Sequence, residues 1–313
     1  MKARYLLAFS FLGCGVMWCG AEDRRSLLQL EQADSLAGPW TAVSLAEDWV
    51  HDGGLRLPVM TNDSRFYRMA VAVEVVPPAA PVIEVVAVPT GSLSTSSWGT
   101  ALFVDGFSLA KYEVAGGLWE AVRVWAAARG YDMTERATAS PGHAVAGVSW
   151  FDAVKWCNAL SEMAGLVPVY LVDGAVYRSG SYGPTISPVT VRAGNGWRLP
   201  TEREWEYAAR GATSSGGFTY AGSNTPGDVA WYNVNAGSVQ AVGTKAPNEL
   251  GLYDMSGNVS EWCFDLVTAG WHTRRARSGS YAVAAASIRW SRRSEFSPDM
   301  VEPWLGLRIA RSL

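Results

Sequence analysis

One stretch of this 313-residue chain carries residue types that could bind a metal ion. In the run Asn248–Trp262, two carboxylates, Asp254 and Glu261, lie seven positions apart. The main-chain carbonyls of Gly257 and Val259 lie between them, in a segment that its glycines predict to be a tight loop. Because calcium takes six to eight oxygen ligands in a flexible geometry, this loop is a candidate calcium site. Alternatively, the two carboxylates accept backbone N–H groups within the turn.

Other catalytic patterns are missing from the sequence. The histidines His51, His143 and His272 are widely spaced, which favours surface or hydrogen-bonded roles over metal binding. The sequence has no G-x-S-x-G elbow, no P-loop and no G-x-G-x-x-G. The carboxylates Glu204 and Glu206 belong to a predicted helix, and we expect both on its solvent face.

A second candidate site lies near the C-terminal end. Segments 289–296 and 300–304 place Trp, Arg, Phe and Glu among small residues, and Trp and Arg dominate binding hot spots. Alternatively, the tryptophans lie in the core and the arginines pair with nearby carboxylates. The candidate ligand-binding residues are Trp290, Arg292, Arg293, Glu295, Phe296 and Trp304.

Residues 1–21 have the pattern of a secretory signal peptide. Lys2 and Arg4 precede an apolar core and a small-residue exit. We expect cleavage at the end of this segment, with a lipid anchor on Cys14 or Cys19 as the alternative. The mature protein would then be exported to the periplasm, the cell surface or the medium. No other stretch is predicted to span a membrane.

The mature chain would keep two cysteines, Cys157 and Cys263. An oxidising compartment permits a disulfide between them, and two buried free thiols are the alternative. Two thiols are too few for a cysteine zinc site.

The composition indicates a compact globular protein, with 49% hydrophobic and 18% charged residues. Its formal charge of −3 would become −5 on removal of Lys2 and Arg4. This mild acidity argues against nucleic acid as a general partner.

The chain is predicted to contain two folded regions. Strands around 26–31, 40–44 and 65–73, separated by Gly- and Pro-containing turns, predict a small β-rich module over 22–75. A proline-rich linker over 76–83 follows.

The main region, 84–313, is predicted to mix short strands with three helices. The first helix carries apolar residues at helical spacing and ends at Gly130. The second is capped by Ser149, with Asp152 three residues on. The third has the capping box Thr201/Glu204 and a stop at Gly211.

Several motifs in this region resemble one known family. They are Asn195–Gly211, Asn248–Trp262, Arg277–Tyr281, Ser297–Asp299 and Leu305–Arg308. Together they closely resemble the formylglycine-generating enzyme, or sulfatase-modifying factor, family. This resemblance implies an α+β fold that is a variant of the C-type lectin fold, here preceded by the small β module.

The resemblance also implies which chemistry is lost. The family's enzyme oxidises a sulfatase cysteine with molecular oxygen, using a pair of active-site cysteines that bind copper, and Cu(I) requires such soft thiolates. Val283 stands at the first of these cysteine positions, and no cysteine occurs after Cys263. Ser260 also replaces a family aromatic. We therefore expect neither copper nor formylglycine generation.

For calcium, the resemblance strengthens the prediction. The family's second calcium site uses a side chain at the position of Asp254, main-chain oxygens at Gly257 and Val259, and the carboxylate of Glu261. All four positions are kept, so we expect one structural Ca²⁺.

Three functions remain open at this point. We favour an exported, non-catalytic binding or structural module that recognises a protein, peptide or glycan in the cleft where the copper site was lost. The first alternative is an oxidoreductase or metal-dependent enzyme of the same superfamily that uses other residues. The second is a surface-displayed variable protein of the diversity-generating-retroelement type, because the chain ends Leu305-Gly-Leu-Arg-Ile-Ala-Arg311 in a similar way.

Overall fold

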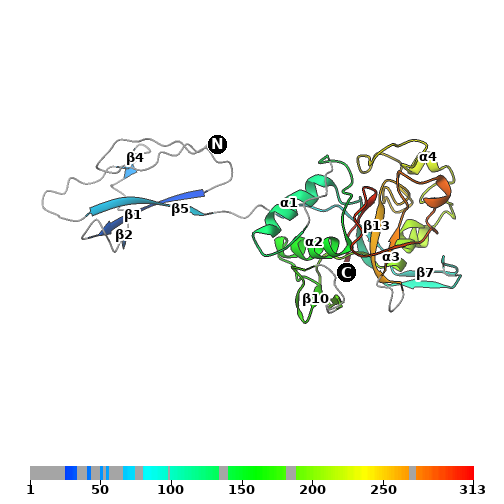
Figure 1. Cartoon of the computed structure of the whole chain (residues 1–313), viewed down its shortest axis with the longest axis horizontal. Helices are drawn as coiled ribbons and strands as arrows, with labels where there is room; N and C mark the ends of the chain where they lie inside the picture. Colours follow the sequence, from blue (N-terminus) through cyan, green and yellow to red (C-terminus); the bar gives the residue numbers. More distant parts are fainter. Residues whose placement is uncertain are drawn as a thin grey trace. The chain divides into compact units, whose positions relative to one another are not determined.

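The computed structural model divides the chain into two units, Met1–Pro78 and Ala79–Leu313 (Figure 1). It describes residues 80–313 apart from 98, 134–139, 181–187 and 268–272, and in the first unit only the backbone of the strands. The predicted signal peptide lies outside the described residues, as does the first half of the predicted linker. Among the helices that are described, none is both long and apolar enough to cross a bilayer.

Unit 1 contains the three predicted strands, paired in the order β2-β1-β5. All pairs are antiparallel, and the long pair β1–β5 runs in continuous register from Arg25 opposite Glu74 to Ala33 opposite Phe66. A short hairpin of β3 and β4 completes the described strands. The bounds are β1 Arg25–Ala33, β2 Thr41–Val43, β3 Val50–His51, β4 Gly54–Leu55 and β5 Phe66–Glu74.

Helices α2 and α3 of unit 2 begin at the predicted caps, whereas α1 ends at Ala127, before the predicted stop at Gly130. The Ser149 side chain accepts the N–H of Asp152 at the start of α2, and Thr201 and Glu204 form the complete capping box of α3. Gly211 follows α3 in the left-handed region, at φ 81°. The bounds are α1 Gly116–Ala127, α2 Trp150–Met163, α3 Glu202–Ala209 and α4 Pro226–Val229, with 3₁₀ turns η2 Ala212–Ser214 and η3 Ala285–Ser287.

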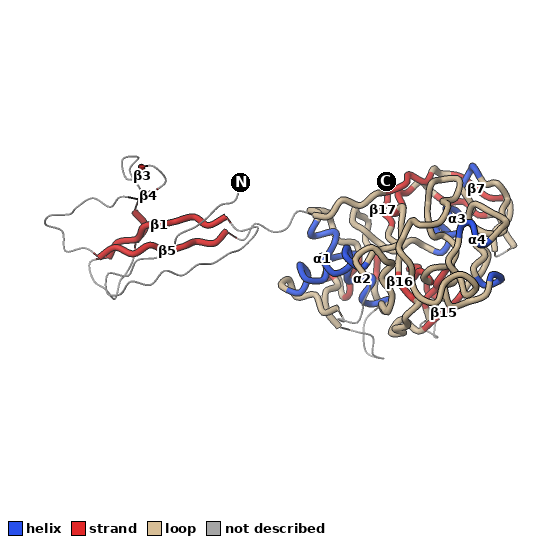
Figure 2. The backbone as a smooth tube through the Cα atoms, turned by 90° about the horizontal axis from the view of Figure 1, so that it is seen from above, coloured by secondary structure: helices blue, strands red, loops and turns tan. Residues whose placement is uncertain are grey.

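The strands of unit 2 are short and are joined mostly by loops (Figure 2). One sheet, β17-β9-β6, brings the beginning and the end of the unit together, because Leu109 pairs with both Val86 and Ala310. The other sheets have the orders β15-β14-β13-β16, β11-β10-β12 and β7-β8. The bounds are β6 Val85–Val88, β7 Gly91–Leu93, β8 Leu102–Val104, β9 Phe107–Ala110, β10 Tyr170–Val172, β11 Ala175–Val176, β12 Thr190–Val191, β13 Ser260–Leu266, β14 Arg274–Arg277, β15 Ser294–Phe296, β16 Leu305–Gly306 and β17 Ala310–Ser312.

Tryptophans dominate the core of unit 2. The rings of Trp119 on α1 and Trp156 on α2 stack with centroids 5.5 Å apart, which joins the two helices. Trp150 donates its indole N–H to the carbonyl of Cys263 at 3.0 Å, so α2 is also tied to β13. The largest fully buried side chains include Trp119, Trp150, Trp156, Trp205 and Trp262.

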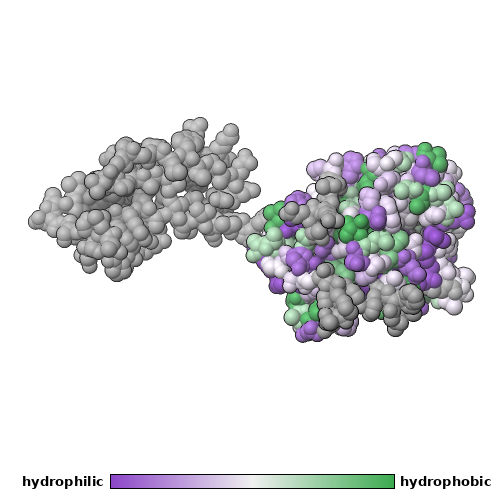
Figure 3. Space-filling view, viewed as in Figure 1, coloured by the Kyte–Doolittle hydropathy of each residue, from purple (hydrophilic) through white to green (hydrophobic). Residues whose placement is uncertain are grey.

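The apolar residues form three clusters. The largest surrounds α1 and α2, the second surrounds α3 with β8 and β9, and the third joins α4 to η3. Figure 1 shows α4 and the neighbouring orange turn η3 at the same side of the unit, away from α1 and α2. On the face shown in Figure 3, hydrophilic and hydrophobic residues are interspersed.

The expectation that Glu204 and Glu206 face solvent is wrong. Glu206 is fully buried, and Glu204 is largely buried against Arg198, with an N–O distance of 2.6 Å. The reason is that β13 and β14 pack on the face of α3 that carries Glu206 and supply Arg277, whose guanidinium lies 2.6 Å from its carboxylate.

Candidate functional site

The loop that precedes β13 is held in place from two sides. The side-chain amide of Asn248 donates to the carbonyl of Ala208 at 2.7 Å, and its Oδ1 accepts the N–H of Leu252 at 3.1 Å. Gly257 has φ 81°, and a Cβ there would lie 2.2 Å from the carbonyl oxygen of Trp231. Only glycine fits this position, because the loop lies directly against the backbone of Trp231.

Asp254 lies in this loop with one carboxylate oxygen unpaired. Its Oδ2 accepts the N–H of Gly243 at 2.7 Å, whereas Oδ1 is buried and has no hydrogen-bond partner. Burial raises the pKa of Asp254 above its ordinary value, although the Gly243 bond and Arg308 oppose this shift. A buried oxygen of this kind is unfavourable unless a proton or a cation meets it.

Glu261, on β13, is already bound by protein groups. Its carboxylate accepts the Trp205 indole N–H at 2.6 Å and lies 2.9 Å from an Arg308 guanidinium nitrogen. Both charged side chains are fully buried. Arg308 also donates to the carbonyls of Ala110 and Tyr253, at 3.0 and 2.7 Å. Glu261 and Arg308 therefore form a buried ion pair whose remaining hydrogen-bonding groups are satisfied.

A third buried carboxylate, Glu113, was not found by sequence reasoning. It accepts the side-chain amide of Asn258 at 2.6 Å and the N–H of Val259 at 3.1 Å. Burial, followed by the charges of Asp254 and Glu261, raises the pKa of Glu113 well above its ordinary value. Its partner Asn258 lies 145 residues further along the chain, so no local pattern could predict this contact. The one local sign of a special role was a carboxylate among apolar residues.

These contacts fit the calcium prediction in part. Asp254 has a buried oxygen with no partner among the described residues, and the carbonyl of Gly257 accepts the Ser278 hydroxyl at 3.0 Å. Glu261 does not fit, because Arg308 and Trp205 occupy its oxygens. In the part of the chain that is described, no three His, Cys, Asp or Glu side chains are arranged to hold a metal ion. Calcium binding stays a prediction.

The second candidate site is not one continuous pocket. Phe296 and Trp304 contact each other, with centroids 5.2 Å apart, and both pack on the core. Trp290 lies elsewhere, where its indole N–H donates to the carbonyl of Phe218 at 2.7 Å and the Arg210 guanidinium lies 4.3 Å from its ring centroid.

The charged candidates also differ from one another. Arg293 pairs with Glu202 at 2.9 Å, and Glu295 lies 3.3 Å from Arg275. Arg292 is exposed. The arrangement of Trp304, Phe296 and Arg293 matches the alternative of core aromatics and paired arginines, and ligand binding by the six residues stays a prediction.

The position at which the family resemblance implies a copper-binding cysteine is apolar. Val283 packs against the third cluster, which contains Tyr220, Val229, Ala230 and Ile288. The thiols of Cys157 and Cys263 are both free and buried, so the structure has the unbridged alternative. Burial raises the pKa of both thiols, which favours the protonated form of each.

Two pockets in the described part of the chain lie apart from the second candidate site. One, of about 430 Å³, lies between the β8–β9 turn and the start of α3. The other, of about 150 Å³, lies beside β9 and the start of α1 and has an apolar lining with Glu113 at one side. Neither is lined by any of the six candidate ligand-binding residues.

The fold and these motifs define a class of protein. The model of the sulfatase-modifying factor enzyme 1-like domain matches residues 73–313, and the chain belongs to this family. The predicted α+β, C-type-lectin-like fold is thereby confirmed, since solved structures of this type superpose on it.

Three relatives are particularly informative. The chaperone protein LppX of Paenibacillus barcinonensis is 36% identical over 196 residues, which cover 53% of this chain and 68% of LppX. The crystal structure of CarF superposes with a TM-score of 0.66 and 30% identity, over 74% of this chain and 99% of CarF. Treponema denticola variable protein 1 superposes with a TM-score of 0.59 and 28% identity, over 74% of this chain and 95% of that protein.

Proposed function

We propose that this protein is an exported binding module that binds polypeptide and does not generate formylglycine. The observation that carries this proposal is the apolar environment of Val283. A copper-dependent oxidase of this family needs thiolates at that place, and this chain supplies packed aliphatic side chains instead. Its two remaining thiols are buried.

Polypeptide is favoured over glycan as the ligand class. LppX, which shares this domain, is named a chaperone protein, and chaperones act on polypeptide chains. Export is supported by the signal-peptide pattern of residues 1–21.

The absence of oxidase activity can be tested directly. The purified mature protein is incubated with copper, oxygen and a cysteine peptide from a sulfatase, beside an active formylglycine-generating enzyme as the control. We expect no change in peptide mass, and no copper or iron in the protein by mass spectrometry. Conversion of the peptide, or one copper or iron per chain, would instead support the enzyme alternative.

Polypeptide binding is tested by light scattering of an unfolded, aggregating protein. We expect the mature protein to suppress aggregation at near-equimolar amounts. The variant Ala284→Asp/Ala286→Asp places charges on exposed positions beside the lost copper site and should weaken suppression. Ala121→Asp, on the exposed face of α1, is the control. Suppression that is absent, or equally strong in both variants, would contradict binding at this place.

The variable-protein alternative is supported by the superposition of Treponema denticola variable protein 1. It predicts that sister isolates differ mainly between Ala282 and Trp304. Sequencing those isolates tests it, and differences spread evenly along the chain would exclude it.

A further inference from the structure

The segment Leu266–Ser294 is unusually basic. It contains six arginines and no Asp or Glu, in a chain of net charge −3. Four of these arginines have internal partners. Arg274 stacks on Trp150 and donates to the Phe264 carbonyl, whereas Arg275, Arg277 and Arg293 pair with Glu202.

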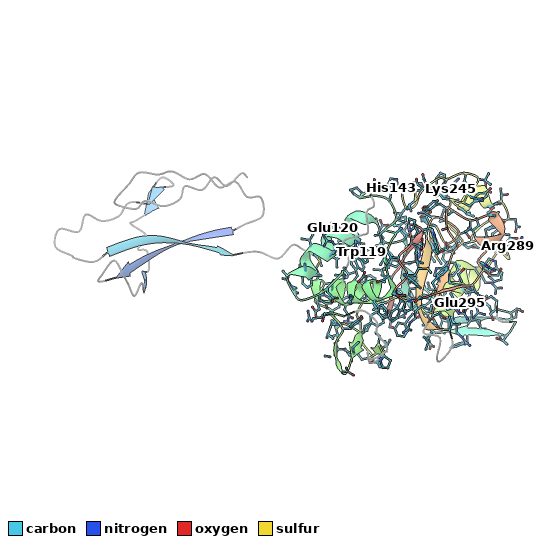
Figure 4. All side chains as sticks on the ribbon, in the orientation of Figure 1. Trp119, Glu120, His143, Lys245, Arg289 and Glu295 are labelled. Carbon is cyan, nitrogen blue, oxygen red and sulfur yellow. The ribbon has the colours of Figure 1, made fainter. Side chains whose placement is uncertain are left out.

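The side chains of the other two arginines, Arg289 and Arg292, project from a single turn of the chain. The N–H of Arg292 donates to the carbonyl of Arg289 at 2.9 Å, and both side chains are exposed. Within the described residues, neither guanidinium has a hydrogen bond, ion pair or ring contact. Figure 4 shows Arg289 at the outer edge of unit 2. We call Arg289–Arg292 the arginine turn.

The side chain of Trp290 anchors the arginine turn to the rest of unit 2. The bond of its indole to Phe218 and the stacking of Arg210 on its ring hold this side chain half-buried. The two guanidinium groups, which are unpaired within the described residues, therefore project from a turn whose central side chain is held in place, and such preorganisation reduces the entropy lost when a ligand binds.

An uncharged surface adjoins the turn. No charged residue occurs in Val229–Thr244 or in Ser278–Ile288, and the two segments are joined by the N–H of Asn233, which donates to the Val283 carbonyl at 3.1 Å. We call this surface the neutral face. It exposes Val234, Ala282, Ala284 and Ala286.

We propose that the neutral face and the arginine turn together bind an extended polypeptide segment that is acidic and otherwise small and apolar. This inference rests on the proposed function and names the class of its ligand. Carboxylates of the segment would pair with Arg289 and Arg292, whose guanidinium forks match carboxylate geometry. Its uncharged residues would lie over the alanines, whose side chains carry no charge.

The charge pattern favours this partner over a basic or a neutral one. Arg289 and Arg292 have no side-chain partner among the described residues, so pairing with a ligand carboxylate breaks no contact that the described structure contains. A basic segment would meet two like charges at close range, which disfavours it.

The test uses the full mature chain and three fluorescent peptides that differ at one repeated position. The probes are repeats of Asp-Ala-Val, Asn-Ala-Val and Lys-Ala-Val, and binding is followed by fluorescence anisotropy. We expect the aspartate peptide to bind at least about tenfold more tightly than the asparagine peptide at low salt, and high salt to shrink this difference.

A charge-reversed variant sharpens the test. Arg289→Glu/Arg292→Glu should bind the lysine peptide more tightly than the aspartate peptide. The control Arg129→Glu/Arg192→Glu makes the same change in net charge at exposed positions outside the arginine turn and should keep the aspartate preference.

The outcomes separate the two proposals. Equal binding of the three peptides, or a preference that the charge reversal does not move, would overturn this inference and leave polypeptide binding in place. Failure of all three peptides to bind would overturn this inference and count against the proposed function as well.

Discussion

Arg308 and the arginine turn offer the same functional group in opposite surroundings. Arg308 is fully buried, and its guanidinium donates to Glu261 and to two main-chain carbonyls. Arg289 and Arg292 are exposed and unpaired within the described structure. In the interior, an arginine without its carboxylate would be strongly unfavourable. At the surface, water replaces the partner, and the group stays available to a ligand.

This comparison shows how to separate structural from functional charges in unit 2. Glu261 was predicted to be a calcium ligand, and Glu206 was expected to face solvent. Both carboxylates, like that of Glu202, instead pair with an arginine. Within the described residues, Asp254 Oδ1 in the interior and the guanidinium groups of the arginine turn at the surface differ from these carboxylates, because they have no partner.

The largest effect is expected from removal of the buried cation. Arg308→Met leaves Glu261 charged and unpaired in the core, so we expect the free energy of unfolding to fall by about 3–5 kcal/mol. Urea unfolding measures this change. Arg289→Met, the exposed control, should cost no more than about 0.5 kcal/mol. Similar losses in the two variants would remove the distinction between the two surroundings.

A smaller effect is expected from calcium. If Asp254 Oδ1 and the nearby carbonyls hold an ion, saturating calcium should add about 1–3 kcal/mol to the free energy of unfolding. Melting curves with calcium and with chelator measure this effect, and Asp254→Ala should abolish the difference. Identical curves for the wild-type protein under both conditions would exclude a stabilising calcium ion.

The pH dependence of stability provides a test of the buried network. Burial raises the pKa of Asp265, which accepts the Glu202 N–H at 2.5 Å, above its ordinary value of 3.8. The native state thus holds this proton more tightly than the unfolded chain. The stabilisation that the protonated Asp265 gives to the native state is therefore full below pH 3.8. It is lost as the pH rises through the higher pKa of the native state. Asp265→Asn should make the melting temperature less dependent on pH over this window. An unchanged pH dependence would contradict the raised pKa of Asp265.

The smallest effect on stability is expected at the arginine turn. Arg289→Ala/Arg292→Ala removes no contact within the described structure, so the free energy of unfolding should stay within about 0.5 kcal/mol of the wild type. The same variant should lose the preference for the aspartate peptide. A clear loss of stability would show that these side chains serve the fold.

Much of the local structure could be predicted, because it depends on residues close in sequence. The cap of α2 joins Ser149 to Asp152, and the capping box of α3 joins Thr201 to Glu204. In both cases the interacting groups lie three residues apart, so their types and spacing suffice. The family and its fold were recognised in the same way, from contiguous motifs.

The tertiary structure alone decided what the charged side chains do. Glu261 lies 47 residues from Arg308, Glu206 lies 71 from Arg277, and Glu113 lies 145 from Asn258. No local pattern reports a partner at such separations, so a carboxylate that suggests a metal ligand can prove to be half of an ion pair. The same long-range packing leaves the guanidinium groups of Arg289 and Arg292 without partners among the described residues. The residue types are set by the sequence, but their availability is set by which distant segments the fold brings beside them.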